Sequence, residues 1–238
     1  MEINADFTQL DHLNRENDVY AQLKYRLSLK WLKKSGIEDS TKLLNVGCGA
    51  GDFNVLAEAK GYSVDGIEPD VEALAIARKR CNAGSRLENV GIFDFKPTST
   101  YRAVVMHDVL EHISDDSGAV RALSRLIASS DNSRLVISVP AHSWLFGLHD
   151  ESLGHFRRYS KKRLIETLES EFDVLQVRYT GLLGIPAALI YSRLLRKPYP
   201  LGEPGLAGKI LAASCFLEEF LPPPIGSSLL VLLRPKAR

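Results

Sequence analysis

The sequence predicts an α/β protein with a doubly wound, mostly parallel sheet of seven strands, an N-terminal helix and a C-terminal helical insertion. Two observations support this fold class. Short apolar runs alternate with longer helix-forming segments between residues 42 and 140. A glycine-rich turn follows the first apolar run, where a buried strand would pass into a helix. The crossovers between parallel strands are expected to be right-handed.

The first predicted element is a helix from about Tyr20 to Lys34. Leu23, Leu27 and Trp31 recur at helical spacing and are expected to face inward. The helix belongs to an appendage, residues 1–41, that precedes the sheet.

The glycine-rich turn connects a predicted strand, 42–47, to a predicted helix, 51–60. Its glycines are Gly47, Gly49 and Gly51, which allow the backbone to turn tightly and to approach a ligand without an intervening Cβ. The turn therefore favours a nucleotide-type cofactor.

Glu68 follows 21 residues after Gly47, at the carboxyl end of a second predicted strand, 63–68. Open α/β sheets bind ligands at this edge, and a carboxylate there can accept hydrogen bonds from both hydroxyls of a ribose. The alternative interpretation is a tight strand-to-helix turn followed by an ordinary surface acid.

Asp52 stands where a dinucleotide-binding fingerprint would require its third glycine. A carboxylate at this position would repel a pyrophosphate, and the loop contains no Lys or Arg to compensate. The loop therefore suits a ligand without phosphates and argues against a nicotinamide-dependent oxidoreductase.

The following segments continue the alternation of strands and helices. A basic run, Arg78-Lys79-Arg80, is interpreted as the solvated end of one predicted helix, where cations favour the helix dipole. The predicted elements up to residue 139 are a helix at 70–81, strands at 86–91 and 102–107, a helix at 117–129 and a strand at 133–139.

With these motifs in order, the chain resembles the class I S-adenosylmethionine-dependent methyltransferases over about residues 20–180. Leu110-Glu111-His112 resembles the L-E-H signature of the branch that includes ubiquinone-pathway O-methyltransferases. The resemblance implies S-adenosylmethionine as cofactor, a ribose-binding role for Glu68 and an adenine-contacting role for Asp94. The residues implied to bind the cofactor are Arg26, Gly47, Gly49, Gly51, Glu68, Asp94, Phe95 and His107.

Arg26 is included because related methyltransferases carry an arginine on such a helix, near the methionine carboxylate of the cofactor. The alternative is an ordinary surface arginine, since most arginines are exposed.

Composition sets broad limits on function. The chain has 238 residues, of which 45% are hydrophobic and 25% charged, with a formal net charge of +1. This suits one domain, divided into an N-terminal helical part (1–41), a cofactor-binding core (42–140) and an acceptor side (141–238). The near-zero charge gives no reason to expect a nucleic-acid partner.

Three cysteines without metal-type spacing favour a reducing compartment, and residues 1–6 lack the apolar stretch of a signal peptide. The expected location is the cytoplasm.

Residues 141–159 are predicted to run over the cofactor face and to form the acceptor site. The segment holds three histidines, two acids and two arginines, and it resembles an H-D-E-x-x-G-H-x-R-R-Y stretch of a bacterial methyltransferase subgroup. His155 and His149 are candidate general bases for an O-methyl transfer, and Asp150 could orient one of them. Arg157 or Arg158 could hold an anionic acceptor.

The same acceptor-side residues admit a structural interpretation. Asp150 and one of the two arginines would then form an ion pair that orders the loop, while the histidines only pack.

Asp108, Glu111 and His112 raise the possibility of a divalent metal, because a turn after the fourth strand would bring two carboxylates and an imidazole to one side. The alternative is that Glu111 and His112 stabilise the loop near the sulfonium. No metal is included among the expected cofactors, because the ligand set is incomplete without water or substrate.

The last part of the chain is expected to complete the sheet around a helical insertion. The predicted elements are a helix at 161–170 with Ser160 as N-cap, a strand at 172–180, a helix at 182–195 interrupted near Pro186, a helix at 206–221 and a strand at 228–233.

The insertion is largely apolar and carries Arg193, Arg196 and Lys197. It could form a lid over a hydrophobic acceptor, a homodimer contact or a peripheral membrane contact. No apolar run reaches the roughly 20 residues that span a bilayer.

The function predicted from these residues is an S-adenosylmethionine-dependent methyltransferase acting on a small, hydroxylated or partly apolar acceptor. Two alternatives stay open at this point: a protein that binds S-adenosylmethionine without transferring its methyl group, and a nicotinamide-dependent oxidoreductase.

Overall fold

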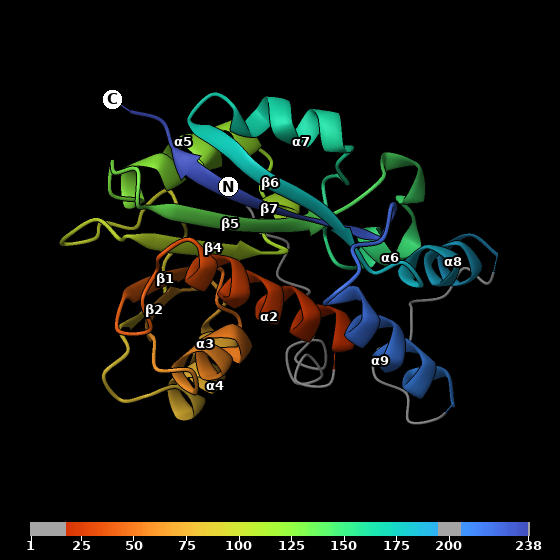
Figure 1. Ribbon diagram of the computed structural model, residues 1–238, viewed down its shortest axis with the longest axis horizontal. Coiled ribbons are helices and arrows are strands. Elements are labelled where there is room, and N and C mark those ends of the chain that lie inside the picture. Colours follow the sequence, from red (N-terminus) through yellow and green to blue (C-terminus); the bar gives the residue numbers. More distant parts are fainter. Residues whose placement is uncertain (1–17, 195–205, 238) are drawn as a thin grey trace.

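The protein folds around one seven-stranded sheet, seen in a computed structural model that describes residues 18–194 and 206–237 (Figure 1). The strand order is β3-β2-β1-β4-β5-β7-β6, with β7 antiparallel to both its neighbours and the other pairs parallel. This confirms the predicted fold class. The strands are β1 Lys42–Val46, β2 Ser63–Ile67, β3 Leu87–Glu88, β4 Ala103–His107, β5 Arg134–Pro140, β6 Phe172–Thr180 and β7 Ser228–Pro235.

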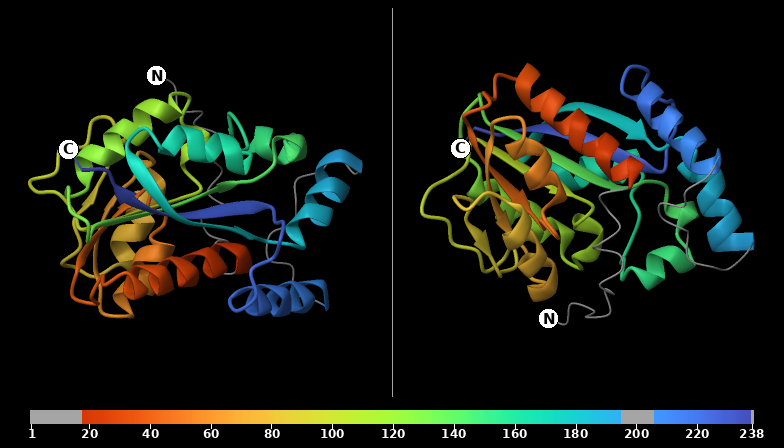
Figure 2. Two further views of the ribbon diagram at one scale, coloured as in Figure 1. Left: turned by 45° about the horizontal axis from the view of Figure 1, so that its top comes forward. Right: turned by 90° about the horizontal axis from the view of Figure 1, so that it is seen from below.

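Helices cover both faces of the sheet (Figure 2). On one face lie α2 Val19–Lys34, α3 Asp52–Glu58 and α4 Val71–Arg80. On the other lie α5 Asp116–Leu126 and α7 Lys161–Leu168. Short helical turns follow the carboxyl ends of β4 and β5: η2 Leu110–His112, η3 Ser143–Leu145 and α6 Leu148–Ser152.

The N-terminal helix α2 forms as the periodicity predicts. Asp18 caps it, since its carboxylate accepts hydrogen bonds from the amides of Tyr20 (2.9 Å) and Ala21 (3.1 Å). The three residues expected to face inward, Leu23, Leu27 and Trp31, are all buried against the sheet. Their burial attaches α2 to the core.

The carboxyl ends of β1, β2, β4 and β5 meet at one edge of the sheet. Val46 pairs with Ile67, and His107 with Ser138, so the residues after these four strands are brought together. Candidate site residues follow each of these strand ends, as expected for an open α/β sheet.

Several predicted elements differ from the structure. The strand expected at 86–91 is only Leu87–Glu88, because the chain turns at once: the amide of Val90 donates to the carbonyl of Glu88 (3.1 Å). The Asn89 side chain stabilises this turn by donating to the carbonyls of Glu68 (2.9 Å) and Pro69 (2.8 Å).

The apolar helix expected at 182–195 is a short α-helix, α8 Gly184–Ala188, continued by a π-helical segment, η4 Leu189–Leu194. Pro186 does not interrupt it, because it lies in the first turn, where the backbone N–H has no helical partner. The last helix, α9 Leu206–Glu218, ends three residues before its predicted end at 221. Arg196 and Lys197 lie outside the described residues.

Within the described ranges, no helix is both long and apolar enough to cross a membrane.

Candidate functional site

The glycine-rich turn after β1 adopts a backbone that other residues would strain. Gly47, Gly49 and Gly51 all have left-handed φ values, of 71°, 53° and 85°. A Cβ on Gly47 would come within 2.3 Å of Cγ2 of Val109, in the turn after β4. The glycine loop therefore packs directly against the turn that leads to Glu111 and His112.

Glu68 is fixed beside this loop. One carboxylate oxygen accepts from the amide of Gly49 (2.8 Å) and the other from the amide of Asp70 (3.0 Å). The side chain is nearly buried, so its orientation is held by backbone groups of two elements. The remaining lone pairs leave it able to accept from a ligand.

Arg80 corrects two expectations about the loop. Its guanidinium lies 2.8 Å from the Asp52 carboxylate and donates to the carbonyl of Ala50 (2.9 Å). Asp52 is thus neutralised by a cation from the end of α4, although the loop itself carries none. Arg78 and Lys79 are exposed as predicted, whereas Arg80 is not a solvated helix end.

A narrow hollow lies beside the loop, lined by Tyr25, Asn45, residues 47–50, Asp52, Phe53 and His107. His107 contacts the rings of Tyr25 (5.0 Å between centroids) and Phe53 (5.1 Å). Its Nε2 lies 2.8 Å from the hydroxyl of Ser28. Burial lowers the pKa of His107 to about 3, so the ring is neutral at physiological pH.

Sequence reasoning missed Tyr25 and Asn45. Asn45 is polar in an otherwise apolar buried strand, where its amide donates to the side chain of Asn54 (2.8 Å). A polar residue inside a buried strand was the available signal for this position.

Asp108 joins the site to α2. It has a left-handed φ of 52°, pairs with the buried Lys24 and accepts from the Ser138 hydroxyl at 3.0 Å. Lys24 was also missed, although a lysine between Leu23 and Leu27 on the inward face of a helix was a usable signal.

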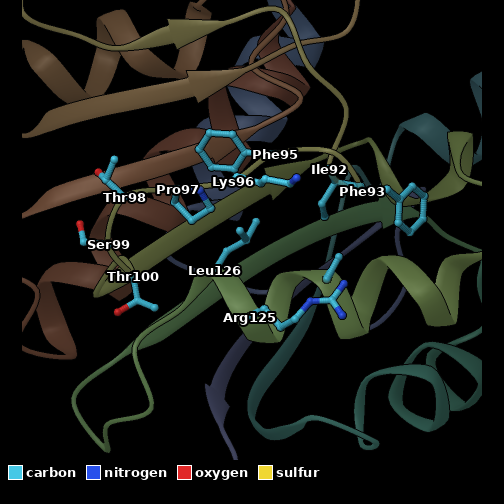
Figure 3. A pocket seen from close by; sticks show the side chains of 11 residues that line it. Ile92, Phe93, Phe95, Lys96, Pro97, Thr98, Ser99, Thr100, Arg125 and Leu126 are labelled. Atoms are coloured by element: carbon cyan, nitrogen blue, oxygen red, sulfur yellow. The ribbon is translucent and has the colours of Figure 1, made fainter.

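Five residues predicted to bind the cofactor do not line the hollow: Gly51 and Glu68, which lie in and beside the glycine loop, and Arg26, Asp94 and Phe95. Arg26 pairs with Glu219, just beyond α9, while its neighbour Tyr25 lines the hollow. Asp94 is exposed, and Phe95 is buried in the core. Phe95 also borders a separate cavity of about 550 Å³ between residues 92–100 and α5 (Figure 3). Their cofactor roles stay predictions.

The acceptor-side segment contains a buried charge network centred on Asp150. His155 Nδ1 lies 2.8 Å from the Asp150 carboxylate, and Arg158 donates to the same oxygen at 2.7 Å. The amide of Gly147 donates to the other oxygen at 3.1 Å. Burial alone would raise the pKa of Asp150, but the bond from His155 and the charge of Arg158 outweigh it and lower the pKa.

The two arginines have different partners. Arg158 is buried with Asp150 and also reaches the carbonyl of Ala141 (3.4 Å). Arg157 pairs instead with Asp116 (2.8 Å), which also accepts from the hydroxyl of Tyr159 (3.0 Å). The pair of Arg158 with Asp150 is the ion pair that the structural interpretation expects, and Arg157 forms a second pair with Asp116.

His155 lies next to the turn after β4. Its ring makes an edge contact with the ring of His112 (4.6 Å between centroids), and the amide of Phe156 donates to the carbonyl of Glu111 (2.8 Å). One ligand atom from each of Glu111, His112 and His155 lies within 4.8 Å of the others. Asp108, expected in this group, is engaged by Lys24 and Ser138 instead, so His155 takes its place.

The other two histidines of the segment do not belong to this group of three. His149 is half-buried in α6. His142, with a left-handed φ of 64°, stacks on Tyr179 (5.3 Å between centroids) and contacts Trp144 (5.3 Å).

The sheet order, the glycine loop after β1 and the acid after β2 define the class of Rossmann-like enzymes that bind an adenosine-containing cofactor at the carboxyl edge of the sheet. Comparison with known proteins then identifies the family. Residues 13–175 match the family described as "Methyltransferase domain". The chain belongs to the class I S-adenosylmethionine-dependent methyltransferases, and S-adenosylmethionine is its cofactor.

Curated relatives include the "Ubiquinone biosynthesis O-methyltransferase" of Thiobacillus denitrificans, 31% identical over 79% of this chain and 83% of the relative. The protein of that name from Yersinia enterocolitica is 33% identical over 40% of this chain. That match spans only 42% of the length of the Yersinia protein.

Solved structures show the same fold. The magnesium protoporphyrin IX methyltransferase of Synechocystis PCC 6803 with bound S-adenosylmethionine has a TM-score of 0.62 at 14% identity, covering 98% of this chain and 93% of that one. The plantazolicin methyltransferase with bound S-adenosylhomocysteine has a TM-score of 0.64 at 14% identity, covering 96% of this chain and 88% of that one. The methyltransferase match excludes the nicotinamide-dependent alternative.

Proposed function

We propose that this methyltransferase transfers the methyl group of S-adenosylmethionine to a hydroxyl oxygen of a small, partly apolar acceptor, with His155 as general base. The observation that carries the proposal is the pairing of His155 with the fully buried Asp150, 2.8 Å away. The pair lies against the turn after β4, which in turn packs on the glycine loop through Val109.

Asp150 favours one tautomer of His155. An ionised carboxylate accepts a hydrogen bond, so Nδ1 carries the proton and Nε2 keeps its lone pair. Arg158 helps Asp150 to stay ionised by lowering its pKa. His155 Nε2 is then a base held in orientation by a second side chain, an arrangement that general-base catalysis requires.

The cofactor is proposed to lie across the carboxyl ends of β1 and β2. Gly47, Gly49 and Gly51 let the backbone approach it closely, and Glu68 accepts from its ribose hydroxyls. The hollow beside Tyr25 and His107 is the candidate location for the methionine end, because it continues from the loop toward β4.

In the proposed step the acceptor oxygen attacks the methyl carbon in line with the sulfur. The new C–O bond forms as the C–S bond breaks, and the hydroxyl proton passes to His155 Nε2. The products are a methyl ether and S-adenosylhomocysteine, and the sulfonium charge is lost from the cofactor. Holding the three reacting atoms in line supplies most of the expected rate enhancement.

An aromatic hydroxyl compound is the acceptor that the segment suits best. Phe156, which is about half-exposed, directly follows His155, and Trp144, also about half-exposed, lies earlier in the same segment beside His142. Apolar side chains beside one oriented base are typical of pockets for such ligands. The relatives named O-methyltransferases support oxygen as the methylated atom.

Glu111, His112 and His155 would also fit a divalent metal, since two imidazoles and a carboxylate converge and Asp150 orients one imidazole from outside. A metal there would act as a Lewis acid toward the acceptor oxygen. In that case His155 is a ligand rather than a base, so transfer by the purified protein would be lost on treatment with a chelator.

The test is transfer of a labelled methyl group from S-adenosylmethionine to 3,4-dihydroxybenzoate and its alkyl esters, with His155→Ala and the matched control His149→Ala. We expect His155→Ala to lower kcat by about 10²-fold or more, because a general base contributes about that much. The control should stay near the unchanged protein, and both variants should still bind S-adenosylmethionine.

Equal activity of the two variants would contradict the role of His155. Binding of S-adenosylmethionine without transfer to any phenol, alcohol or carboxylate would favour the alternative of a protein that binds the cofactor only.

A further inference from the structure

Helix α9 presents an apolar surface to solvent. Five large side chains, each between 54% and 71% exposed, recur at helical spacing along it and the turn that follows: Ile210, Phe216, Leu217, Phe220 and Leu221. We call this surface the α9 face. Apolar side chains that gather on one exposed helix face usually mark an interaction surface.

The opposite side of α9 is already used by the fold. Cys215 is buried in the cluster that includes α2, and the Glu218 carboxylate accepts from the amides of Gly181 (2.7 Å) and Leu182 (3.0 Å). The orientation of the helix is therefore fixed. The α9 face cannot turn inward without breaking these contacts.

The exposed charges around the α9 face are positive. The Lys30 ammonium lies 5.4 Å from the centre of the Phe220 ring, and Lys209 is exposed on α9. From Gly208 to Pro224 the acids are Glu218, which is buried, and Glu219, which pairs with Arg26. The surface thus combines apolar side chains with cations that no described acid neutralises nearby.

We propose that the α9 face docks on a phospholipid bilayer that contains anionic lipids. Phenylalanine and leucine side chains that enter the acyl boundary, flanked by lysines that reach the headgroups, are the features of an interfacial membrane contact. A contact at the membrane surface is also consistent with the described helices, none of which is both long and apolar enough to cross a bilayer.

The charge pattern favours a bilayer over a second copy of the chain. In a twofold contact the same patch lies on both sides, so Lys30 and Lys209 would be brought against a surface that carries the same two cations and no unpaired described acid. Anionic headgroups supply the missing charge, and their attraction falls with salt.

The location of the α9 face connects it with the site. Lys30 and Arg26 of α2 contact Phe220 and Glu219, and the same helix contributes Tyr25 to the hollow beside the glycine loop. Figure 1 shows α9 beside the start of α2 at one end of the molecule. Docking would bring this end to the membrane, so an acceptor dissolved in the bilayer is the substrate class expected. That extension rests on the proposed O-methyl transfer, whereas the docking itself does not.

The experiment is co-sedimentation of the full chain with vesicles of phosphatidylcholine alone and with added phosphatidylglycerol. We expect binding to the anionic vesicles, and a decrease of about tenfold or more in Phe216→Ser/Phe220→Ser, because both rings leave the acyl boundary. Lys30→Gln should lower binding about fivefold, which is the contribution to affinity expected of one cation near an anionic surface. Val71→Ser, which alters an equally exposed apolar residue on α4, is the matched control.

Equal binding of the double variant and the control, or no binding of the unchanged protein, would overturn the proposal. A concentration-dependent dimer that the double variant dissociates, without vesicle binding, would assign the face to a second copy instead. Because these residues lie outside the proposed active site, methyl transfer to a water-soluble acceptor should be unchanged. Loss of docking can therefore be told apart from failure of the proposed function.

Discussion

The two halves of the site are held by different kinds of interaction. Between β1 and β4, the cofactor side is shaped mainly by backbone: left-handed glycines, a close approach between Gly47 and Val109, and amides that donate to Glu68. After β5, the acceptor side is shaped by side-chain charges, centred on Asp150 and on Asp116.

Because the interactions differ, the two halves of the site should be sensitive to different kinds of substitution. A backbone-shaped site is sensitive to any Cβ that its close approaches exclude, since the peptide must move. A charge network is sensitive to the loss of one partner, which leaves the other buried and unpaired. Substitutions in the two halves should therefore give distinct signatures in stability and cofactor affinity.

The largest effect is expected from Asp150→Ala. It removes the partner of the buried Arg158, and stranding a buried cation costs about 3–5 kcal/mol of unfolding free energy. Urea denaturation measures this loss. The exposed pair of Asp173 with Arg234 is the control, because Asp173→Ala should cost at most about 1 kcal/mol.

The double variant Asp150→Ala/Arg158→Met sharpens this prediction. Removing both charges should recover much of the stability. Methyl transfer should stay low, because His155 still lacks its orienting carboxylate. Recovery of activity together with stability would contradict the positioning role of Asp150.

Gly47→Ala should come next, with a loss of about 2–4 kcal/mol from left-handed strain and from the contact with Val109. Its affinity for S-adenosylmethionine should fall as well, which titration calorimetry measures. Gly36→Ala is a matched control, since Gly36 has a similar φ of 78° and no atom within 4 Å of its Cβ position. An equal loss of unfolding free energy in Gly47→Ala and Gly36→Ala would show that left-handed strain accounts for the effect without the contact to Val109.

His107, at the end of β4 between the two halves of the site, should make the free energy of unfolding depend on pH. Its folded pKa is depressed to about 3, so its contribution is complete above the unfolded value near 6.5 and is lost as pH falls below it. The slope should rise toward about 1.4 kcal/mol per pH unit as pH falls below about 6, measured by urea unfolding between about pH 7 and pH 5. His107→Asn should reduce this slope, whereas the exposed Lys79→Gln should leave it unchanged.

The smallest effect is expected from Arg80→Gln, which releases Asp52 and the carbonyl of Ala50 in the loop. Asp52 is buried, but Arg80 is partly exposed and the amide introduced at position 80 can still donate a hydrogen bond, so the free energy of unfolding should change by about 1 kcal/mol. The affinity for S-adenosylmethionine should fall about threefold to tenfold, because the loop is less well held. Arg78→Gln, on the same turn of α4, should leave the affinity unchanged.

The fold was largely predictable because each strand carries its own local signal. An apolar run, a turn residue and a helical repeat recur within 10 to 20 residues, and β6 and the cap at Ser160 appear where expected. The predictions were wrong where an element is short or its backbone is irregular. Asn89 ends β3 through its side chain, and the π-helical η4 has a backbone that apolar periodicity does not specify.

The site was predictable to the extent that residues close in sequence form it. Glu68 lies beside the glycine loop, and Asp150 reaches His155 five residues later. Pairs across the fold, such as Lys24 with Asp108 and Arg80 with Asp52, depend on how α2 and α4 dock, which one sequence does not encode locally. The division of the chain at residues 41 and 140 stays a prediction.

The position of β7 also determines when the sheet can be completed. It lies between β5 and β6, so β6 has no hydrogen-bonded neighbour among the described strands until residues 228–235 are in place. During synthesis the parallel strands β1 to β5 can assemble first, while β6 waits for the C-terminal strand. Until then, one edge of β5 and all of β6 present unpaired backbone, the surface on which nascent chains aggregate. Folding of this protein should therefore be slowest, and most dependent on chaperones, in its last step.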